Sequence, residues 1–235
     1  SGMGVQPDNG NYLFFWDETV AAPTYALSTD AALLAPGSVE RDTPSNWANP
    51  DNAYDYIAII GAQRFYTGTT TLGGQLAAAV QPLLAYRATE GLNVALVNVQ
   101  DIYDEWSYGR IDPHAIRSFL SYAAYNWATT PDYVLLVGDG HYDYNKVTTQ
   151  TLPNLVPPYL AYVDPWWGEV PTDNLYVSVD SVADYLPDMA VGRFPANSAA
   201  DVSALVNKTL SYENQSTNPP GLWQQRAVYV ADDCS

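Results

Sequence analysis

The chain has 235 residues, which is enough for one larger α/β domain or for one domain with an appendage. Its net charge of −17, with only nine Lys and Arg, would repel a phosphate backbone and excludes nucleic acid as a partner. A single cysteine, Cys234, excludes an internal disulfide framework and a Cys-based zinc site, and no apolar run of about 18 residues could form a transmembrane segment.

Residues 1–53 are expected to form a small N-terminal β appendage. Two short apolar and aromatic runs, at 11–16 and 24–28, are typical of strands. Turn-forming Pro, Gly, Asn and Asp then dominate residues 36–52.

From residue 54 to residue 225 the pattern becomes regular and predicts a main domain. Apolar runs predict strands at 56–60, 93–99, 133–137, 175–179 and 189–193. Three helices lie between them. The first carries an apolar stripe from Leu76 to Leu84 and stops at Gly91, the second opens at Asp112-Pro113, and the third is capped by Ser198.

The alternation of strands and helices indicates the fold class. It predicts a doubly wound α/β domain with a mainly parallel sheet and helices on both faces. Residues 226–231 predict one more strand, with no helix after it to cover its face. We therefore expect residues 226–235 to begin a second subdomain that continues beyond this chain.

Functional groups in such sheets collect at the carboxyl ends of the strands. The strand ending at 137 brings His141 there, and the strand at 226–231 brings Cys234. A cysteine needs a partner that lowers its thiol pKa, so a His141–Cys234 dyad is one hypothesis. Asp232 and Asp233 argue against it, because negative charge raises that pKa. The competing interpretation makes His141 a hydrogen-bonded structural residue of a turn and Cys234 a plain free thiol.

Carboxylates on the expected loops allow a second kind of site. Asp139, Asp143, Asp173 and Asp180 supply the oxygen ligands that a structural Ca²⁺ would need, although their spacing matches no EF-hand. The competing interpretation, a solvated acidic surface, is the simpler one. Glu169, beside Trp166 and Trp167, could face a sugar, but no second carboxylate stands at a glycosidase spacing. No cofactor is required by any motif.

Several segments taken in order resemble the gingipain-type cysteine peptidase domain, including its type-IX-secretion sortase-like relatives. The resemblance covers about residues 54–233 and depends on segments 86–94, 99–105, 112–120, 133–140, 142–144, 156–159, 172–174, 186–195 and 230–233. Among them are Gly138-Asp139-Gly140 and Val191-Gly192-Arg193-Phe194-Pro195.

The resemblance implies a caspase-like fold with two α/β subdomains, of which this chain holds the first. It also implies a catalytic His and Cys in the second subdomain, in motifs like T-G-H-G and A-C-x-N/S-G, and neither motif occurs here. By position, Asp188 matches the acid that orients the catalytic His. Neither His141 nor Cys234 matches a catalytic position of the family.

Three functional hypotheses follow. The first makes the chain the scaffold half of a secreted or cell-surface cysteine endopeptidase that acts on polypeptides and is inactive alone. The second is a non-catalytic, Ca²⁺-stabilised extracellular binding module. The third is a self-contained thiol hydrolase built on His141 and Cys234.

Overall fold

The computed structural model describes most of the main domain. It covers residues 44–61, 71–143, 153–180, 186–214, 221, 223 and 226–229, and the backbone of 6–8 and 12–14; the side chains of residues 71, 72, 163 and 164 are outside the description. The chain divides into two compact units, Ser1–Thr43 and Pro44–Ser235.

The first unit contains the small β appendage. Strand β1 (Gln6–Asp8) pairs antiparallel with β2 (Tyr12–Phe14), so the expected strand at 11–16 is confirmed at its centre. The strand expected at 24–28 lies outside the described residues.

The second unit is built on a four-stranded parallel sheet in the order β4-β3-β5-β8. The strands are β3 (Tyr56–Ile60), β4 (Val94–Asn98), β5 (Tyr133–Val137) and β8 (Ala190–Phe194). All five residues of β3 are buried, as a central strand covered on both faces requires. The predicted doubly wound α/β class is therefore confirmed.

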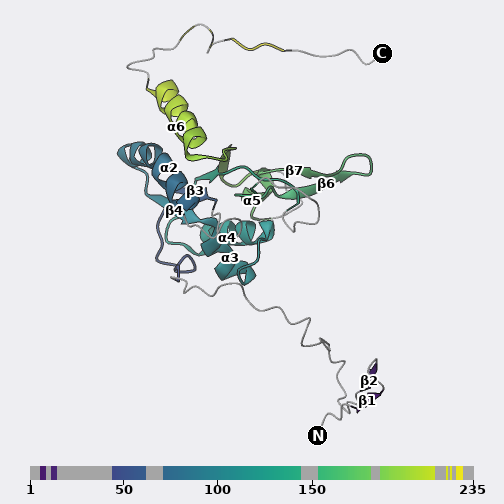
Figure 1. Cartoon of the computed structure of the whole chain (residues 1–235). Coiled ribbons are helices and arrows are strands. Elements are labelled where there is room, and N and C mark those ends of the chain that lie inside the picture. Colours follow the sequence, from purple (N-terminus) through teal and green to yellow (C-terminus); the bar gives the residue numbers. More distant parts are fainter. Residues whose placement is uncertain are drawn as a thin grey trace, which may run out of the picture. The chain divides into compact units, whose positions relative to one another are not determined.

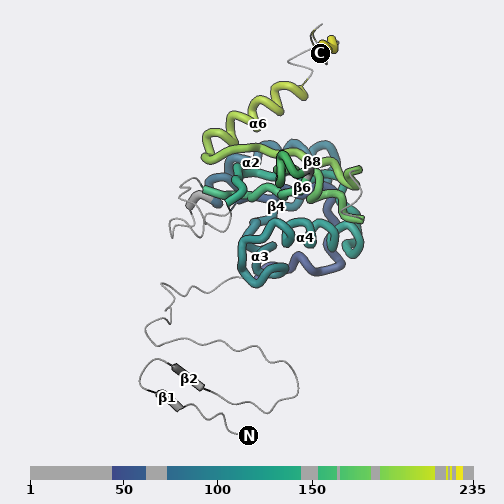
Figure 2. Tube along the Cα trace, turned by 90° about the vertical axis from the view of Figure 1, so that its right-hand side faces the viewer, coloured from purple at the N-terminus to yellow at the C-terminus, as the bar shows by residue number. Residues whose placement is uncertain are grey.

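Helices cover both faces of the sheet (Figures 1 and 2). Helices α2 (Thr71–Thr89) and α6 (Ala199–Glu213) pack on one face, around a core that includes Leu76, Leu83 and Val202. Helices α3 (Val99–Ser107) and α4 (Pro113–Asn126) pack on the other, around Ile102, Phe119 and Trp127. Along β3, Ile57 and Ile59 belong to the second core and Ala58 and Ile60 to the first, as strand alternation dictates.

The helix ends follow the signals in the sequence. The carboxylate of Asp112 accepts a hydrogen bond from the backbone N–H of His114 at 2.9 Å, and Pro113 opens α4. The hydroxyl of Ser198 likewise accepts from Asp201 N at the start of α6. Gly91 takes φ +92° just beyond α2, a conformation that favours glycine. The caps satisfy backbone groups at the helix ends that have no partner within the helix.

Three expectations were wrong. Residue 99 does not extend a strand, because Asn98 caps α3 by accepting from Gln100 N, and the helix begins directly after β4. The apolar run at 175–179 is no strand but contains most of the short helix α5 (Asn174–Val177), since burial and composition alone do not separate a short strand from a buried turn of helix. Residues 226–229 form no strand, and Tyr229 is 92% exposed, with no strand of the described part of the chain to pair with.

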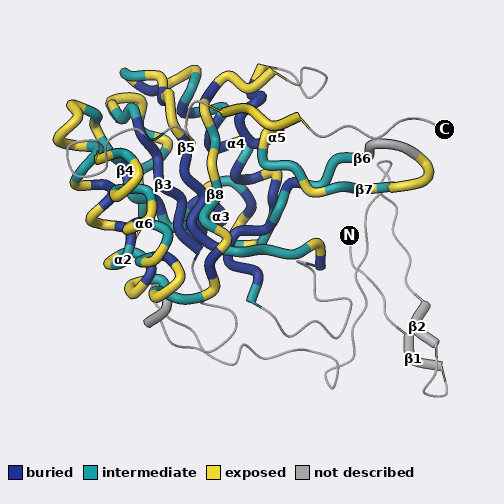
Figure 3. Tube along the Cα trace, turned by 90° about the horizontal axis from the view of Figure 1, so that it is seen from above, coloured by how far each residue is buried: buried dark blue, intermediate teal, exposed yellow. Residues whose placement is uncertain are grey.

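A β-hairpin projects from the carboxyl edge of the sheet within the segment 144–174. Strand β6 (Leu160–Asp164) pairs antiparallel with β7 (Gly168–Pro171). Figure 3 shows it reaching away from the buried centre, with exposed residues at its turn. Ala161 packs on the core at the hairpin base, so the hairpin has one attached face and one open face.

Candidate functional site at the carboxyl edge of the sheet

The turn after β5 is packed tightly against its neighbours. Gly138 N donates to Phe194 O at 3.0 Å, and the main-chain oxygen of Asp139 accepts from both Leu155 N and Val156 N, at 2.9 and 3.2 Å. Gly138 has φ +144°, and a Cβ there would stand 2.8 Å from the Cβ of Leu155. Glycine is needed at this position both for its backbone conformation and for the close approach of the segment 155–156.

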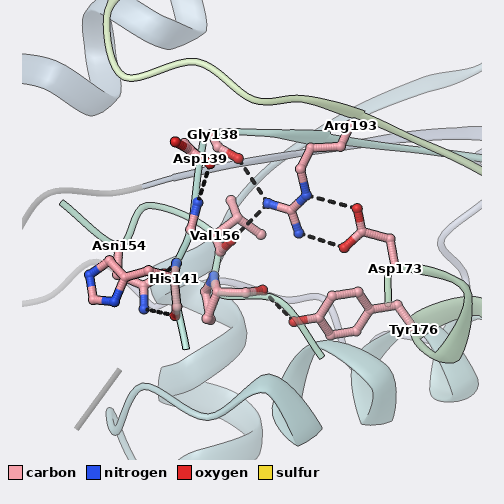
Figure 4. A network of polar contacts seen from close by, with 10 residues as sticks. Gly138, Asp139, His141, Asn154, Val156, Asp173, Tyr176 and Arg193 are labelled. Atoms are coloured by element: carbon pink, nitrogen blue, oxygen red, sulfur yellow. Dashed lines mark hydrogen bonds and ion pairs between the residues drawn. The ribbon is translucent and has the colours of Figure 1, made fainter. Parts of the chain in front are cut away.

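Arg193, on β8, holds the centre of the site (Figure 4). Its guanidinium forms a two-point ion pair with Asp173, at 2.7 and 2.8 Å. Its Nη1 donates to the main-chain oxygens of Gly138 and Val156, at 2.8 and 2.7 Å. One planar cation therefore links β8, the turn after β5, the segment at 156 and the start of α5.

Two buried tyrosines lie in the core beside this network. The hydroxyl of Tyr176 donates to Pro157 O at 2.6 Å, whereas the hydroxyl of Tyr103 has no hydrogen-bond partner in the described structure. Burial raises the pKa of both phenols well above the ordinary value, and for Tyr103 the charge of Asp112 adds to the increase. Both side chains therefore stay neutral over the physiological range.

His141 is tied into the turn by its neighbours. Its Nδ1 accepts from Asp143 N at 3.2 Å, while the side chain of Asn154 accepts from His141 N at 3.2 Å and donates to His141 O at 2.8 Å. Asp143 itself is buried, at 5% exposure. These contacts give His141 a defined place in the turn. Cys234, its partner in the dyad hypothesis, lies outside the described residues.

A cleft of about 450 Å³ opens at this edge. Its walls come from the turn at 139–142, from Pro158, Leu160 and Glu169 at the hairpin, and from residues 171–173 with Arg193. The only Lys or Arg of the described lining is Arg193, which is already paired with Asp173, so Asp139 and Glu169 leave the cleft with negative charge. The location of the cleft agrees with the rule that open α/β sheets bind their ligands at the carboxyl ends of the strands.

Asp188 and Asp180 lie at the opposite edge of the sheet. Asp188 stands two residues before β8, and its Oδ2 accepts from Val179 N at 2.7 Å and from Asp180 N at 3.4 Å. In the parallel register Ala190 aligns with Tyr133, the first residue of β5. Asp188 therefore caps a turn at the amino edge, far along the strands from His141.

The four carboxylates considered for Ca²⁺ are not gathered in one place. Asp139 and Asp173 line the cleft, and Asp143 is nearby in the turn, but Asp180 is at the amino edge. Over the described ranges no group of three or more His, Cys, Asp or Glu side chains is arranged to hold a metal ion.

The sheet order, the helix layers on both faces and a cleft at the carboxyl edge define a doubly wound α/β domain with a site at the strand ends. The model of peptidase family C25 matches residues 49–235, so the chain belongs to this family, the gingipain family of cysteine peptidases. The predicted resemblance is thereby confirmed. No curated protein sequence matches the chain significantly.

Several solved structures resemble this chain. Dimeric latent PorU from Porphyromonas gingivalis is 25% identical with a TM-score of 0.54, over 76% of this chain and 17% of that chain. The complex of RgpB pro- and mature domains from the same organism is 18% identical with a TM-score of 0.46, over 67% of this chain and 29% of that chain. The Arg-specific gingipain R (RgpB) is 19% identical with a TM-score of 0.46, over 73% of this chain and 31% of that chain. The chain thus spans less than a third of each of these proteins.

Arg193 is the central residue that sequence reasoning missed. It stands in the segment Val191-Gly192-Arg193-Phe194, and Asp173 in Thr172-Asp173-Asn174, both of which carried the family resemblance. An arginine within a largely buried sheet signals a carboxylate partner. Which of the many carboxylates it binds depends on β8 lying beside β5, and that neighbour relation is a tertiary fact.

Proposed function

We propose that this chain is the first α/β subdomain of a secreted or cell-surface cysteine endopeptidase, where it acts as the scaffold and one wall of the substrate cleft. Membership of peptidase family C25 is the observation that carries the proposal. In this proposal residues 54–225 form the first subdomain, and the catalytic His and Cys lie in a second subdomain that begins with residues 226–235.

In the intact enzyme a cysteine thiolate attacks the peptide carbonyl, and a histidine protonates the leaving amine. The described part of this chain positions the loops of the cleft and supplies no reacting atom. Arg193 and Asp173 hold the loops of the carboxyl edge in register, and the cleft beside them accepts a polypeptide. Asp188 stays a separate proposal for the acid that orients the catalytic imidazole. It lies at the amino edge, opposite the cleft, so this role and the role of the cleft as substrate site are alternatives.

Peptide hydrolysis tests the proposal. Two proteins are compared, this chain and a version extended by about 200 residues downstream, a typical domain length. Cys234→Ala is made in both. Activity only in the extended form, unchanged by Cys234→Ala, supports the proposal. Activity in the short chain that disappears with Cys234→Ala contradicts it and assigns the site to His141 and Cys234. In the extended form, Asp188→Asn should lower kcat if Asp188 orients the histidine.

Two further properties remain part of the proposal. Secretion is supported by membership of the family. As a separate finding, none of the described helices has the length and apolar composition of a membrane span. A structural Ca²⁺ is tested by the melting temperature with and without EDTA, at matched ionic strength. An unchanged melting temperature would remove Ca²⁺ from the account.

A further inference from the structure

One face of the β6–β7 hairpin carries lining residues of the cleft and extends beyond it. Leu160 is paired with Pro171, and Tyr162 with Glu169, in the antiparallel register. Directly opposed residues project on the same face, and so do residues two apart along a strand. Leu160, Pro171, Tyr162 and Glu169 therefore share one face, and three of them also line the cleft.

Exposure confirms which face is open. Tyr162 is 69% exposed, and Glu169 and Pro171 are exposed as well, whereas Ala161 of the alternate set packs against the core. At the hairpin turn Trp166 and Trp167 are 94% and 79% exposed. A line of side chains, aromatic or apolar except for one carboxylate, thus runs from the cleft to the hairpin turn. We call it the hairpin track: Leu160, Tyr162, Trp166, Trp167, Glu169 and Pro171.

The charge around the track has one sign. Glu169 lies in its middle and makes no ion pair with a described residue, and Asp139 faces the cleft at its inner end. Arg193, the cation of the cleft, is held by Asp173. The whole chain carries −17, so a cationic partner is attracted from a distance and an anionic one is repelled.

Aromatic faces favour the same partner. Trp and Tyr rings attract Lys and Arg side chains through the negative charge of the ring face, most strongly for Trp. A strand rises about 3.4 Å per residue, so an extended peptide of about five residues matches the length of β6, which has five residues. Its side chains on one face would then meet the rings of Tyr162 and the tryptophans and the carboxylate of Glu169.

We propose that the hairpin track binds an extended polypeptide segment rich in Lys or Arg, outside the position of peptide-bond cleavage. The inference rests on the proposed function, since it makes the track a docking site for the polypeptide on which the enzyme acts. It is nevertheless a binding property of this chain alone and requires no catalysis.

Fluorescence anisotropy of labelled peptides with the full chain tests the inference. The probe is a peptide of about seven residues with Lys at alternate positions, a length that covers the track, and the comparison peptide has Glu in place of Lys. We expect the Lys peptide to bind, and to bind more weakly as salt rises. Glu169→Gln should weaken binding by about two- to fivefold, and Trp166→Ala with Trp167→Ala by about fivefold.

Matched variants at the amino edge separate the track from the general charge. Asp51→Asn also removes one negative charge, and Tyr125→Ala removes an aromatic ring that is 66% exposed, so both should leave the affinity unchanged. All substituted side chains are exposed, and circular dichroism confirms that the variants keep the fold.

Several outcomes would overturn the inference. They are equal binding of the Glu peptide, an equal loss with Asp51→Asn, self-association of the chain that Trp166→Ala abolishes, or binding of a neutral oligosaccharide to the same tryptophans. Its failure is distinguishable from that of the proposed function. An extended protein that hydrolyses peptides while the track variants bind normally refutes only the docking site. Binding without activity refutes only the peptidase assignment.

Discussion

Arg193 and Asp173 form a two-point ion pair that holds the carboxyl edge of the sheet together. The guanidinium side chain is 15% exposed and the carboxylate 28%, so water screens the pair only partly. Since Arg193 also donates to two main-chain oxygens, one side chain satisfies polar groups from segments that are far apart in the sequence.

Arg193→Lys should destabilise the domain by about 2 kcal/mol, because an ammonium keeps the charge but cannot reproduce the guanidinium's planar set of hydrogen bonds. Urea unfolding measures the change. Arg226→Lys is the control, since Arg226 is exposed and the same substitution there should change the free energy of unfolding by less than about 0.5 kcal/mol. Equal effects of the two variants would contradict the central role of Arg193.

Gly138→Ala should destabilise by about 2 kcal/mol or more, because its φ of +144° is strained for any other residue and its Cβ would meet Leu155. Gly192, in the neighbouring strand β8, has no atom within 4 Å of the point where a Cβ would stand, so Gly192→Ala is the matched control. We expect this control to be neutral or to stabilise by about 0.5 kcal/mol. Thermal unfolding measures the stability of both variants. Similar losses of stability would contradict the role assigned to the turn at Gly138.

Tyr103→Phe should not destabilise the domain and should stabilise it by up to about 1 kcal/mol, since it removes a buried hydroxyl that has no partner in the described structure. Tyr176→Phe removes a hydroxyl that donates to Pro157 O and should cost about 1 kcal/mol. Both residues are buried tyrosines of the same core, so each is the control of the other. A reversed order of the two unfolding free energies would contradict the assigned contacts.

The domain should lose stability in alkali. Burial raises the pKa of Tyr56, Tyr103 and Tyr176 above the ordinary value of 10.0. Above pH 10 the unfolded state therefore releases phenolic protons that the folded state keeps. Each tyrosine contributes a loss of about 1.4 kcal/mol per pH unit between its unfolded and folded pKa, and no loss below the unfolded value.

Urea unfolding at a series of pH values from about 9 to about 11.5, spanning the ordinary phenol pKa, measures this slope. Tyr103→Phe should reduce it by one tyrosine's share, whereas Tyr125→Phe, at an exposed position, should leave it unchanged. A slope that does not respond to Tyr103→Phe would show that Tyr103 is not buried as described.

The main elements could be predicted because their causes are local. The apolar run at Tyr56–Ile60, the capped start at Asp112-Pro113 and the glycine stop at Gly91 each combine a side-chain pattern with a backbone requirement. The resemblance to the gingipain family also depended on segments readable in order along the chain. Where the only signal was a short apolar run, as at 175–179, the predicted strand was wrong, because such a run does not separate a strand from a buried turn of helix.

The candidate site could be predicted only in part. His141, Asp139 and Asp173 were identified as residues of the loops that follow or join the strands, but the sequence could not show that Asp173 is bound to Arg193 or that Asp180 lies at the other edge. These relations follow from which strands are neighbours.

The sequence by itself determined the alternation of strands and helices, the polarity of each face and the family. Only the tertiary structure decided that β8 lies beside β5, that one arginine joins the carboxyl-edge loops, and that the hairpin presents Tyr162 and Glu169 on the same open face. The physical reason is the distance along the chain over which each interaction acts. Caps, turns and periodicity act over a few residues, whereas ion pairs and strand order join groups that only the folded chain brings together.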